Sequence, residues 1–286
     1  MSESVVIDAH HHFWDPARAE YPFLTDELAD IRRRFGPEDL RPLLDAVGVD
    51  RTVLVQTRSS LEETGEFMAT AAATDFVAGV VGWVDLTDPA VGETLAALRE
   101  RPDGTTLVGI RHQVHDEPDP GWLEREDVAR GLRAVADAGL AYDLLVKPRE
   151  LPAALATARA FPDLRLVIDH IAKPPIASGE IESWAALMTP FGELPHVFCK
   201  LSGMVTEADW ERWTPDDLAP YVARVMETFG EDRVMFGSDW PVCLLAGSYQ
   251  QIFAVLEQAL EPLSVETRGK VFGGNAVRFY ELTVDR

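Results

Sequence analysis

The sequence has few cysteines, few basic residues relative to acidic ones and no long apolar run, and each shortage excludes a class of protein. Cys199 and Cys243 are its only cysteines, so we exclude a disulfide-stabilised scaffold and expect reduced thiols, as in a cytoplasmic enzyme. Its 26 lysines and arginines are outnumbered by 48 aspartates and glutamates, which gives a net charge of -22. Because nucleic acids and anionic membranes bind basic surfaces, we expect a small-molecule partner instead.

Sequence signals for targeting and for phosphate binding are missing as well. No apolar stretch approaches the roughly 20 residues that span a bilayer, and residues 1–4 lack the basic region and apolar core of a signal peptide. We therefore expect a cytoplasmic protein with no membrane partner. No glycine-rich phosphate loop follows the first apolar run, and neither a Walker loop nor a zinc-finger spacing is present.

Short apolar runs alternate with segments of helical composition along the chain. We expect strands at 5–14, 52–56, 77–84, 107–112, 141–146, 164–170, 197–202 and 233–239. We expect helices at 37–47, 61–74, 89–101, 124–138, 150–160, 181–188, 215–229, 249–259, 265–271 and 275–282. Eight such units favour an α/β fold, a (β/α)8 TIM-type barrel in one domain, 1–286. An open doubly wound sheet is the alternative, and the missing glycine-rich loop argues against it.

The segment 13–36 has neither a clear strand period nor a clear helix period. Long segments of this kind are often functional, and this one leaves directly from a histidine cluster, so we interpret it as a lid. It contains Arg32, Arg33 and Arg34, for which we favour a solvated charge run over an anion site.

The first predicted strand ends in side chains with strong ligand chemistry. Because side chains alternate between faces, we expect Asp8, His10 and His12 on one face and His11 on the other. Two imidazoles on one face can bind one metal ion or one substrate oxygen together. The structural alternative is a polar strand end that runs into a turn.

Polar residues also follow several of the later strands, at the carboxyl ends where active sites of such barrels lie. They are Gln56, Arg111, His112, Asp169, His170, Lys200, Ser202 and Asp239. Six of the seven histidines, all except His196, lie at or just after the carboxyl end of a predicted strand. This distribution indicates one shared site.

Asp239 is the residue for which we most expect a catalytic role. It ends an apolar strand, where a buried carboxylate is unfavourable without partners or a function, and nearby cations would keep it ionised as a base for water. The alternative is a cap on the following turn. His170 is a candidate metal ligand, a donor to a developing oxyanion, or a hydrogen-bonding residue of the core.

Three basic side chains at the same strand ends have less specific roles. The Arg111 guanidinium suits a carboxylate or a polarised carbonyl. His112 is the next residue along the strand and points to the opposite face, so we expect only one of these two side chains to reach the substrate. For Lys200 we favour an exposed lysine on the rim over a Schiff-base lysine.

At these residues the sequence resembles the amidohydrolase superfamily, in the branch of sugar-lactone hydrolases and pyrone dicarboxylate lactonase. The resemblance covers nearly the whole chain. It rests on the segments IDAHHHFW (7–14), GIRH (109–112), YDLLVKP (142–148), IDHIAKP (168–174), KLSG (200–203), FGSDWP (236–241) and GNAVRFY (274–280). Each segment is weak alone, but seven in the same order are a specific signal.

The resemblance implies a distorted barrel, a histidine pair at His10 and His12, a further histidine at His170 and a general base at Asp239. The chain departs from the binuclear pattern of the superfamily at two strand ends. The fourth strand ends in Arg111-His112 instead of a bridging lysine or glutamate, and the fifth has no histidine. We therefore expect either one divalent ion, zinc, on His10, His12, His170 and Asp239, or a metal-free site.

The function predicted from these groups is hydrolysis of a sugar-acid lactone to the open aldonate. Asp239 would take a proton from the attacking water, and a metal ion, or Arg111 and a protonated His170, would stabilise the oxyanion. Substrate contacts would come from Arg111, His112, His10 and His12. The alternatives are a zinc-dependent decarboxylase of an aromatic or unsaturated acid, and a ligand-binding barrel without catalysis.

Overall fold

The computed structural model describes residues 5–284, so residues 1–4, considered above for a signal peptide, lie outside the described part. Eight strands form one sheet in sequential order, and every neighbouring pair is parallel. The strands are β1 (Ile7–His11), β2 (Arg51–Val55), β3 (Val77–Gly82), β4 (Leu107–His112), β5 (Ala141–Leu144), β6 (Leu166–Ile168), β7 (Val197–Leu201) and β8 (Val234–Phe236).

Backbone hydrogen bonds beyond the end of β8 bring the first and last strands together. The Asp239 N–H donates to the His10 carbonyl at 2.8 Å, and the His12 N–H donates to the Trp240 carbonyl at 2.7 Å. The closure therefore lies at the carboxyl end, where it joins the histidine segment directly to the expected catalytic aspartate. The predicted (β/α)8 barrel is confirmed.

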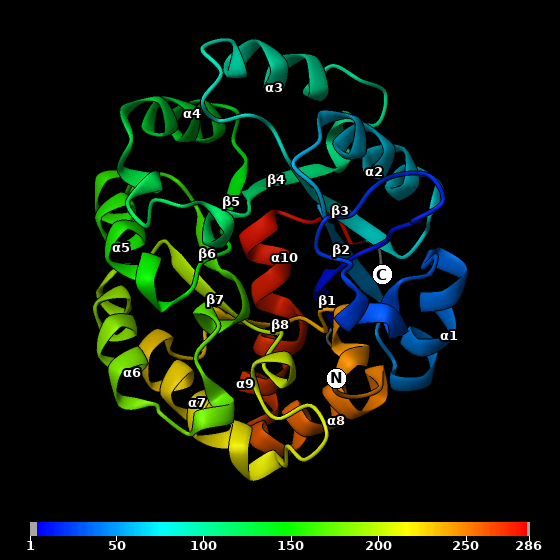
Figure 1. Cartoon of the computed structure of the whole chain (residues 1–286), viewed down its shortest axis with the longest axis vertical. Helices are drawn as coiled ribbons and strands as arrows, with labels where there is room; N and C mark the ends of the chain where they lie inside the picture. The colour runs from blue at the N-terminus through cyan, green and yellow to red at the C-terminus, as the bar shows by residue number, and fades with distance from the viewer. Residues whose placement is uncertain (1–4, 285–286) are drawn as a thin grey trace.

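Helices surround the ring of strands (Figure 1). The α-helices of the described residues are α1 (Pro37–Val47), α2 (Leu61–Ala73), α3 (Val91–Arg99), α4 (Glu126–Asp137), α5 (Leu151–Ala160), α6 (Glu182–Met188), α7 (Pro215–Phe229), α8 (Tyr249–Leu260), α9 (Val265–Gly269) and α10 (Asn275–Tyr280), and of these α10 does not belong to the outer layer. Local chemistry explains several ends: α1 begins with Pro37 and ends before Gly48, which has φ +74°. In the described residues no helix combines the length and the apolarity needed to cross a bilayer.

β6 and β8 end before their predicted boundaries because the chain turns as it enters the site. β6 ends at Ile168, and the next residues, from His170 to Lys173, have φ between 48° and 60°. β8 ends at Phe236, and Asp239 has φ 57°. Left-handed conformations of non-glycine residues are uncommon and unfavourable, and where they persist they cluster at functional sites.

The C-terminal helix α10 differs from the other helices because it lies within the ring of strands instead of around it (Figure 1). Phe279, Tyr280 and Leu282 pack with Ile7, Val53 and other residues of the strands. Arg165, which precedes β6, donates to the Phe279 carbonyl at 2.8 Å. The sequence predicted a helix over 275–282 but not its position inside the ring of strands.

The segment 13–36 folds back over the carboxyl end of β1. Trp14 and Phe35 exchange backbone hydrogen bonds of 3.1 and 2.9 Å, which close the segment at its base. The Trp14 indole donates to the Ile31 carbonyl at 3.1 Å. Its role as a lid remains a proposal.

Candidate active site

A cavity of about 210 Å³ opens at the carboxyl end of the barrel. Four of the predicted site residues line it, namely His12, Arg111, His170 and Asp239. His10 lies below them with no exposed surface. Trp14 and Phe23 from the segment 13–36 line the same cavity, so the residues proposed as a lid border the predicted site.

His10 at the end of β1 and His12 just beyond it converge as predicted, but Asp8 does not join them. The Nε2 atoms of His10 and His12 lie 3.2 Å apart. Asp8 instead accepts from the Ser238 N–H at 2.8 Å and from the Tyr249 hydroxyl of α8 at 3.0 Å. The expectation for Asp8 was wrong because the β1–β2 register shifts between Asp8 and His11, which breaks the alternation of faces. His11 points away, toward the Thr52 hydroxyl at 2.8 Å.

His170 is held by the turn after β6 and by strand β7. Its Nδ1 lies 2.8 Å from the Ser202 hydroxyl, and its ring centroid is 4.4 Å from that of His10. Gly203 permits this approach, because a Cβ there would lie 2.6 Å from His170 Nδ1. Burial lowers the pKa of His170 well below its usual value, so the imidazole is neutral. The expected protonated His170 is therefore not supported.

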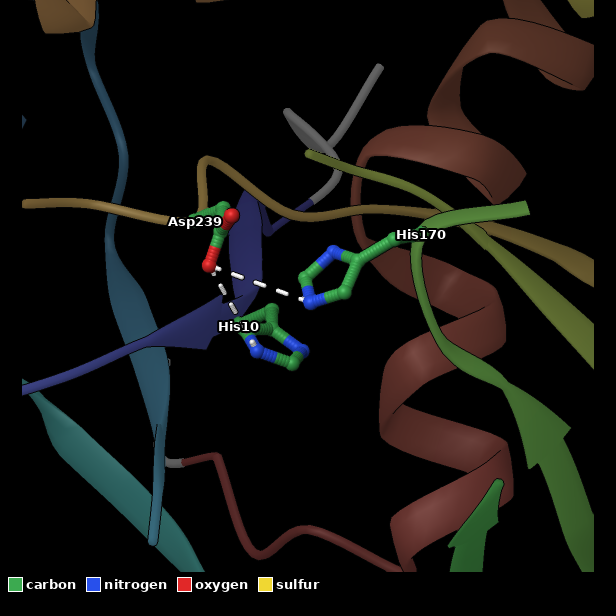
Figure 2. Close-up of side chains that lie close together, drawn as sticks. All are labelled: His10, His170 and Asp239. Carbon is green, nitrogen blue, oxygen red and sulfur yellow. Dashed lines mark ion pairs between the residues drawn. The ribbon is translucent and has the colours of Figure 1, made fainter. Parts of the chain in front are cut away.

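Asp239 faces the imidazoles across the top of the barrel (Figure 2). Its Oδ1 lies 3.4 Å from His12 Nε2, 3.8 Å from His10 Nε2 and 3.9 Å from His170 Nε2. Gly237 allows β8 to approach β1, since a Cβ there would lie 2.7 Å from His10 Cβ. Burial alone raises the pKa of Asp239, but His170 and His12 lower it by more, so the carboxylate is ionised at neutral pH.

The proton positions on the imidazoles favour a cation at their centre. His12 Nδ1 lies 2.8 Å from the Val55 carbonyl, which can only accept, so in the neutral ring Nε2 presents a lone pair. Arg111 Nη1, which can only donate, lies 3.2 Å from His10 Nε2, so that nitrogen is also unprotonated and its lone pair accepts from Arg111. Two unprotonated nitrogens 3.2 Å apart, both facing a carboxylate, are stabilised by a positive charge between them.

The same donor set matches the ligands of a single divalent ion. Ligand atoms of His10, His170 and Asp239 all lie within 4.8 Å of one another, and His12 adjoins them. Imidazole nitrogens with one carboxylate oxygen are common zinc ligands. The permanently charged Arg111 lies against His10, which disfavours a second cation on that side.

Arg111 and His112, neighbours on β4, point to opposite sides, as predicted. Arg111 donates twice to the Gln56 side chain at 2.8 and 3.1 Å and once to the Gln56 carbonyl at 2.5 Å. It also donates to Asp169 Oδ2 at 3.0 Å and to His10 Nε2 at 3.2 Å, so all five N–H groups are engaged. Arg111 therefore brings positive charge to the cavity floor but no free donor.

His112 lies outside the cavity, and we do not retain it as a substrate-binding residue. The Trp83 indole donates to its Nδ1 at 3.0 Å, and its Nε2 lies 2.7 Å from Glu117 Oε1. The ring stacks on Trp122 with centroids 4.3 Å apart. Both ring nitrogens and one face are thus occupied by its neighbours.

Lys200 is fully buried, so the expectation of an exposed rim lysine was wrong. Its Nζ lies 2.6 Å from Asp143 Oδ2, 3.0 Å from Asp169 Oδ1 and 3.2 Å from His10 Nδ1. The ammonium tolerates burial because two carboxylates meet it inside the barrel. Burial raises the pKa of Asp143 to about 6. Burial also favours a higher pKa for Asp169, but Lys200 and His10 outweigh it and lower the pKa of Asp169 well below its usual value.

Five polar side chains that line the cavity received no role from the sequence, and these are Thr57, Gln113, His115, Asp116 and Lys173. Lys173 comes from the left-handed turn after β6, and its Nζ donates to Glu207 Oε1 at 2.6 Å. All five follow a predicted strand end by a few residues. That position was the available signal, but it does not show which loop residues turn inward.

Comparison with known proteins agrees with this arrangement. The sequence profile of the Amidohydrolase family matches residues 7–282. This chain belongs to that family. An L-fucono-1,5-lactonase of Burkholderia ambifaria is 44% identical over 282 residues, which cover 96% of this chain and 95% of that protein.

Two further relatives come from Burkholderia multivorans. An L-fucono-1,5-lactonase is 37% identical over 287 residues and covers 96% of each chain. The crystal structure of an amidohydrolase with bound zinc has a TM-score of 0.93 at 37% identity and covers 98% of this chain and 100% of that one. The resemblance inferred from the seven sequence segments is thus confirmed at the level of the family.

Proposed function

We propose that this amidohydrolase hydrolyses the 1,5-lactone of a six-carbon sugar acid of the L-fuconate type to the open aldonate. The observation that carries the proposal is an ionised carboxylate, Asp239, surrounded by three imidazoles at the end of a small cavity. The sugar-lactone reaction predicted from the sequence agrees with the activity named for both lactonase relatives, each of which matches 96% of this chain. The proposal therefore combines local chemistry with similarity over nearly the full length.

The cavity lining suits a small polyhydroxylated ring. Trp14, Phe23, Leu145 and Val242 provide apolar surface, against which the carbon-bound hydrogens of a sugar can pack. The polar side chains Thr57, Gln113 and His115 provide hydrogen-bonding groups for hydroxyls. Such a wall binds a neutral lactone without needing a fixed anion-binding group.

Asp239 is the group we assign to water activation. Its carboxylate takes one proton from a water molecule while the water oxygen attacks the lactone carbonyl carbon, which forms a tetrahedral oxyanion. When the carbon–oxygen bond of the ring breaks, the same carboxyl returns the proton to the departing ring oxygen. One water is consumed, and the products are the hydroxyl and the carboxylic acid of the aldonate.

Lys173 is our candidate for stabilising the oxyanion. Its side chain lines the cavity, and Glu207 accepts one of the three N–H donors of its ammonium. Arg111 adds charge from the floor, although its own donors are engaged by Gln56, Asp169 and His10. A directed donor together with a fixed positive charge favours an anion that forms during the reaction.

We infer that His10, His12, His170 and Asp239 would hold one zinc ion. The zinc-bound relative from B. multivorans supports the identity of the metal, and the facing unprotonated nitrogens support its position. When bound, the ion would supply Lewis acidity and make a water easier to deprotonate. That assistance suits a carboxylate whose lowered pKa makes it a weak base.

A panel of purified lactones tests the proposal. Acid release would be followed with a pH indicator for 1,5- and 1,4-lactones of six-carbon and five-carbon sugar acids. An equal amount of the Asp239→Asn protein corrects for spontaneous opening. We expect the fastest turnover with a six-carbon 1,5-lactone of the L-fuconate configuration. Absence of acid release above the control from every lactone would contradict the proposal.

Two further experiments test the decarboxylase alternative and the requirement for zinc. Aromatic and unsaturated carboxylic acids would be tested for carbon dioxide release, which a decarboxylase would give and a lactonase would not. The lactone assay would be repeated after chelation, dialysis and zinc addition, with bound zinc measured by elemental analysis. Loss and recovery of turnover in parallel with bound zinc would support the metal assignment. Full turnover by zinc-free protein would refute a requirement for the ion.

A further inference from the structure

A layer of buried charges lies directly beneath the active-site imidazoles. Lys200 contacts Asp143 at 2.6 Å and Asp169 at 3.0 Å, and Arg111 contacts Asp169 at 3.0 Å. The exposed fraction of these side chains is between 0% and 3%. Two positive and two negative groups thus balance one another within the buried part of the barrel.

The layer contacts both ring nitrogens of His10: Arg111 lies against Nε2, and the pair of Asp169 and Lys200 lies against Nδ1. Nδ1 lies 3.4 Å from Asp169 Oδ1 and 3.2 Å from Lys200 Nζ. Both ring nitrogens face a side chain that can only donate, since Arg111 lies against Nε2 and Lys200 against Nδ1. Asp169 Oδ1 lies 3.4 Å from Nδ1, closer than Asp239 Oδ1 lies to Nε2 at 3.8 Å, which favours the proton of His10 on Nδ1, toward Asp169. A partner of this kind fixes which ring nitrogen is protonated and how the ring is oriented.

The C-terminal helix enters this layer from the opposite end of the barrel. The Tyr280 hydroxyl on α10 donates to Asp143 Oδ2 at 2.7 Å, and its ring centroid is 5.4 Å from Lys200 Nζ. Asp143 Oδ2 therefore accepts hydrogen bonds from both Tyr280 and Lys200, whereas Asp143 Oδ1 has no hydrogen-bond partner in residues 5–284. The hydroxyl supports the one carboxylate oxygen that holds Lys200.

We propose that Tyr280 is a positioning residue that acts on His10 through Asp143 and Lys200. Its hydroxyl keeps Asp143 turned toward Lys200, and Asp143 keeps the ammonium shared between two carboxylates. Without this support the ammonium moves closer to Asp169 and competes with the Nδ1–H of His10 for Asp169 Oδ1. The His10 ring then loses its single tautomer, and its Nε2 no longer faces Asp239 in a fixed direction.

The composition of the layer argues that it does more than fill space. A layer formed only for packing would be apolar, as Phe279 and Leu282 are on the same C-terminal segment. Buried ion pairs are weak sources of stability, and apolar residues of similar volume often replace them without loss. Here the charges contact both ring nitrogens of a site histidine, which gives them a role that apolar side chains do not have.

Tyr280→Phe tests the proposal, with Tyr221→Phe as the matched control. Both changes remove one buried tyrosine hydroxyl. The Tyr221 hydroxyl has no hydrogen-bond partner in the described chain, and the Tyr221 ring packs against Trp184. The measurements are kcat and KM for the lactone that the wild-type protein hydrolyses, and the ring ¹⁵N chemical shifts of His10. The His10 signals would be assigned from their absence in a His10→Gln variant.

We expect Tyr280→Phe to lower kcat about tenfold with KM changed less than twofold, because a hydrogen bond to a charged group is lost at a positioning contact. The His10 shifts should move from a protonated Nδ1 and unprotonated Nε2 toward an average of both tautomers. Tyr221→Phe should match the wild type in both measurements. Tyr280→Phe protein with wild-type kcat and wild-type His10 shifts would overturn the proposal, whatever its melting temperature.

The kinetic part rests on the proposed lactonase function, but the spectroscopic part does not. If the wild-type protein hydrolyses no lactone, the proposed function fails and the His10 shifts alone decide the positioning role. Altered shifts in Tyr280→Phe, with unchanged shifts in Tyr221→Phe, would then support it. Unchanged shifts in both variants would refute it.

Discussion

Two polar layers lie one above the other inside this barrel and differ in the way they hold their charges. The upper layer, which consists of His10, His12, His170 and Asp239, borders the cavity and combines unprotonated imidazole nitrogens with one carboxylate. The lower layer, which consists of Arg111, Asp143, Asp169 and Lys200, is buried, reaches the cavity only at Arg111, and pairs two cations with two anions. The first is incomplete without a substrate or cation, whereas the second is complete.

This difference indicates what each layer contributes. An incomplete layer gains little stability from its polar groups, and they remain available for chemistry. A complete layer of buried charges depends on all its members, because removal of one leaves another uncompensated. We therefore expect changes in the upper layer to affect turnover, and changes in the lower layer to affect stability as well.

The largest effect should follow from a change in the upper layer. Asp239→Asn removes the proposed proton acceptor while it keeps the size of the side chain, so kcat should fall by about 10³- to 10⁴-fold. The melting temperature should not fall, because the carboxylate makes no ion pair as close as those of the layer below. Stopped assays on large amounts of protein, with calorimetry, would measure both. Near-normal turnover would remove Asp239 from its assigned role.

Lys200→Met, in contrast to Asp239→Asn, should destabilise the protein. The ammonium sits between Asp143 and Asp169, and its loss leaves two uncompensated buried carboxyl groups. We expect the free energy of unfolding at pH 7 to drop by about 3–5 kcal/mol. Denaturant titration would measure it, with Lys270→Met as a control, since Lys270 pairs with Glu231 at the surface. A loss no larger than that of the control would show that the lower layer is not interdependent.

Arg111 and His112 allow a comparison between neighbours that point to opposite sides of β4. Arg111→Met removes the positive charge from the cavity floor and the donor to His10, so kcat/KM should fall by about 100-fold. His112→Gln should change kcat/KM by less than about twofold, because its ring contacts Trp83, Glu117 and Trp122 outside the cavity. Steady-state kinetics on both variants would measure this contrast. Equal losses would restore His112 to the substrate site.

The smallest effect concerns the pH dependence of the lower layer. Burial raises the pKa of Asp143 from 3.8 to about 6, so the folded protein binds this proton more tightly than the unfolded chain. Its contribution to stability is therefore present below pH 4 and is lost as the pH rises through 6. Relative to Asp143→Asn, the wild-type unfolding free energy should decrease by about 2 kcal/mol over that range.

Denaturant titrations of both proteins at several pH values between 4 and 7 would measure this difference. The Asn variant cannot titrate at this position, so it removes the contribution of the other groups from the comparison. A constant difference, or one that increases with pH, would show that Asp143 is ionised throughout the range.

Most of the fold could be predicted because its elements follow local patterns. The proline at the start of α1 and Gly48 at its end predicted that helix to the residue, since capping depends on neighbours in sequence. The ends of β6 and β8 were predicted too late. At both ends the sequence still has the composition of a strand although the backbone already turns. Nothing in the local sequence marks His170 and Asp239 as residues with a left-handed conformation.

The sequence by itself determined the alternation of strands and helices, and with it the edge on which polar strand ends meet. It also determined the candidates Asp239, His170, His10 and His12, because parallel strands in a barrel place their carboxyl ends together. The tertiary structure alone decided that Asp8 leaves the site, that Lys200 is buried and that Tyr280 enters the barrel from below. These outcomes depend on a shift in register and on partners 57 and 137 residues away along the chain, which no local pattern encodes.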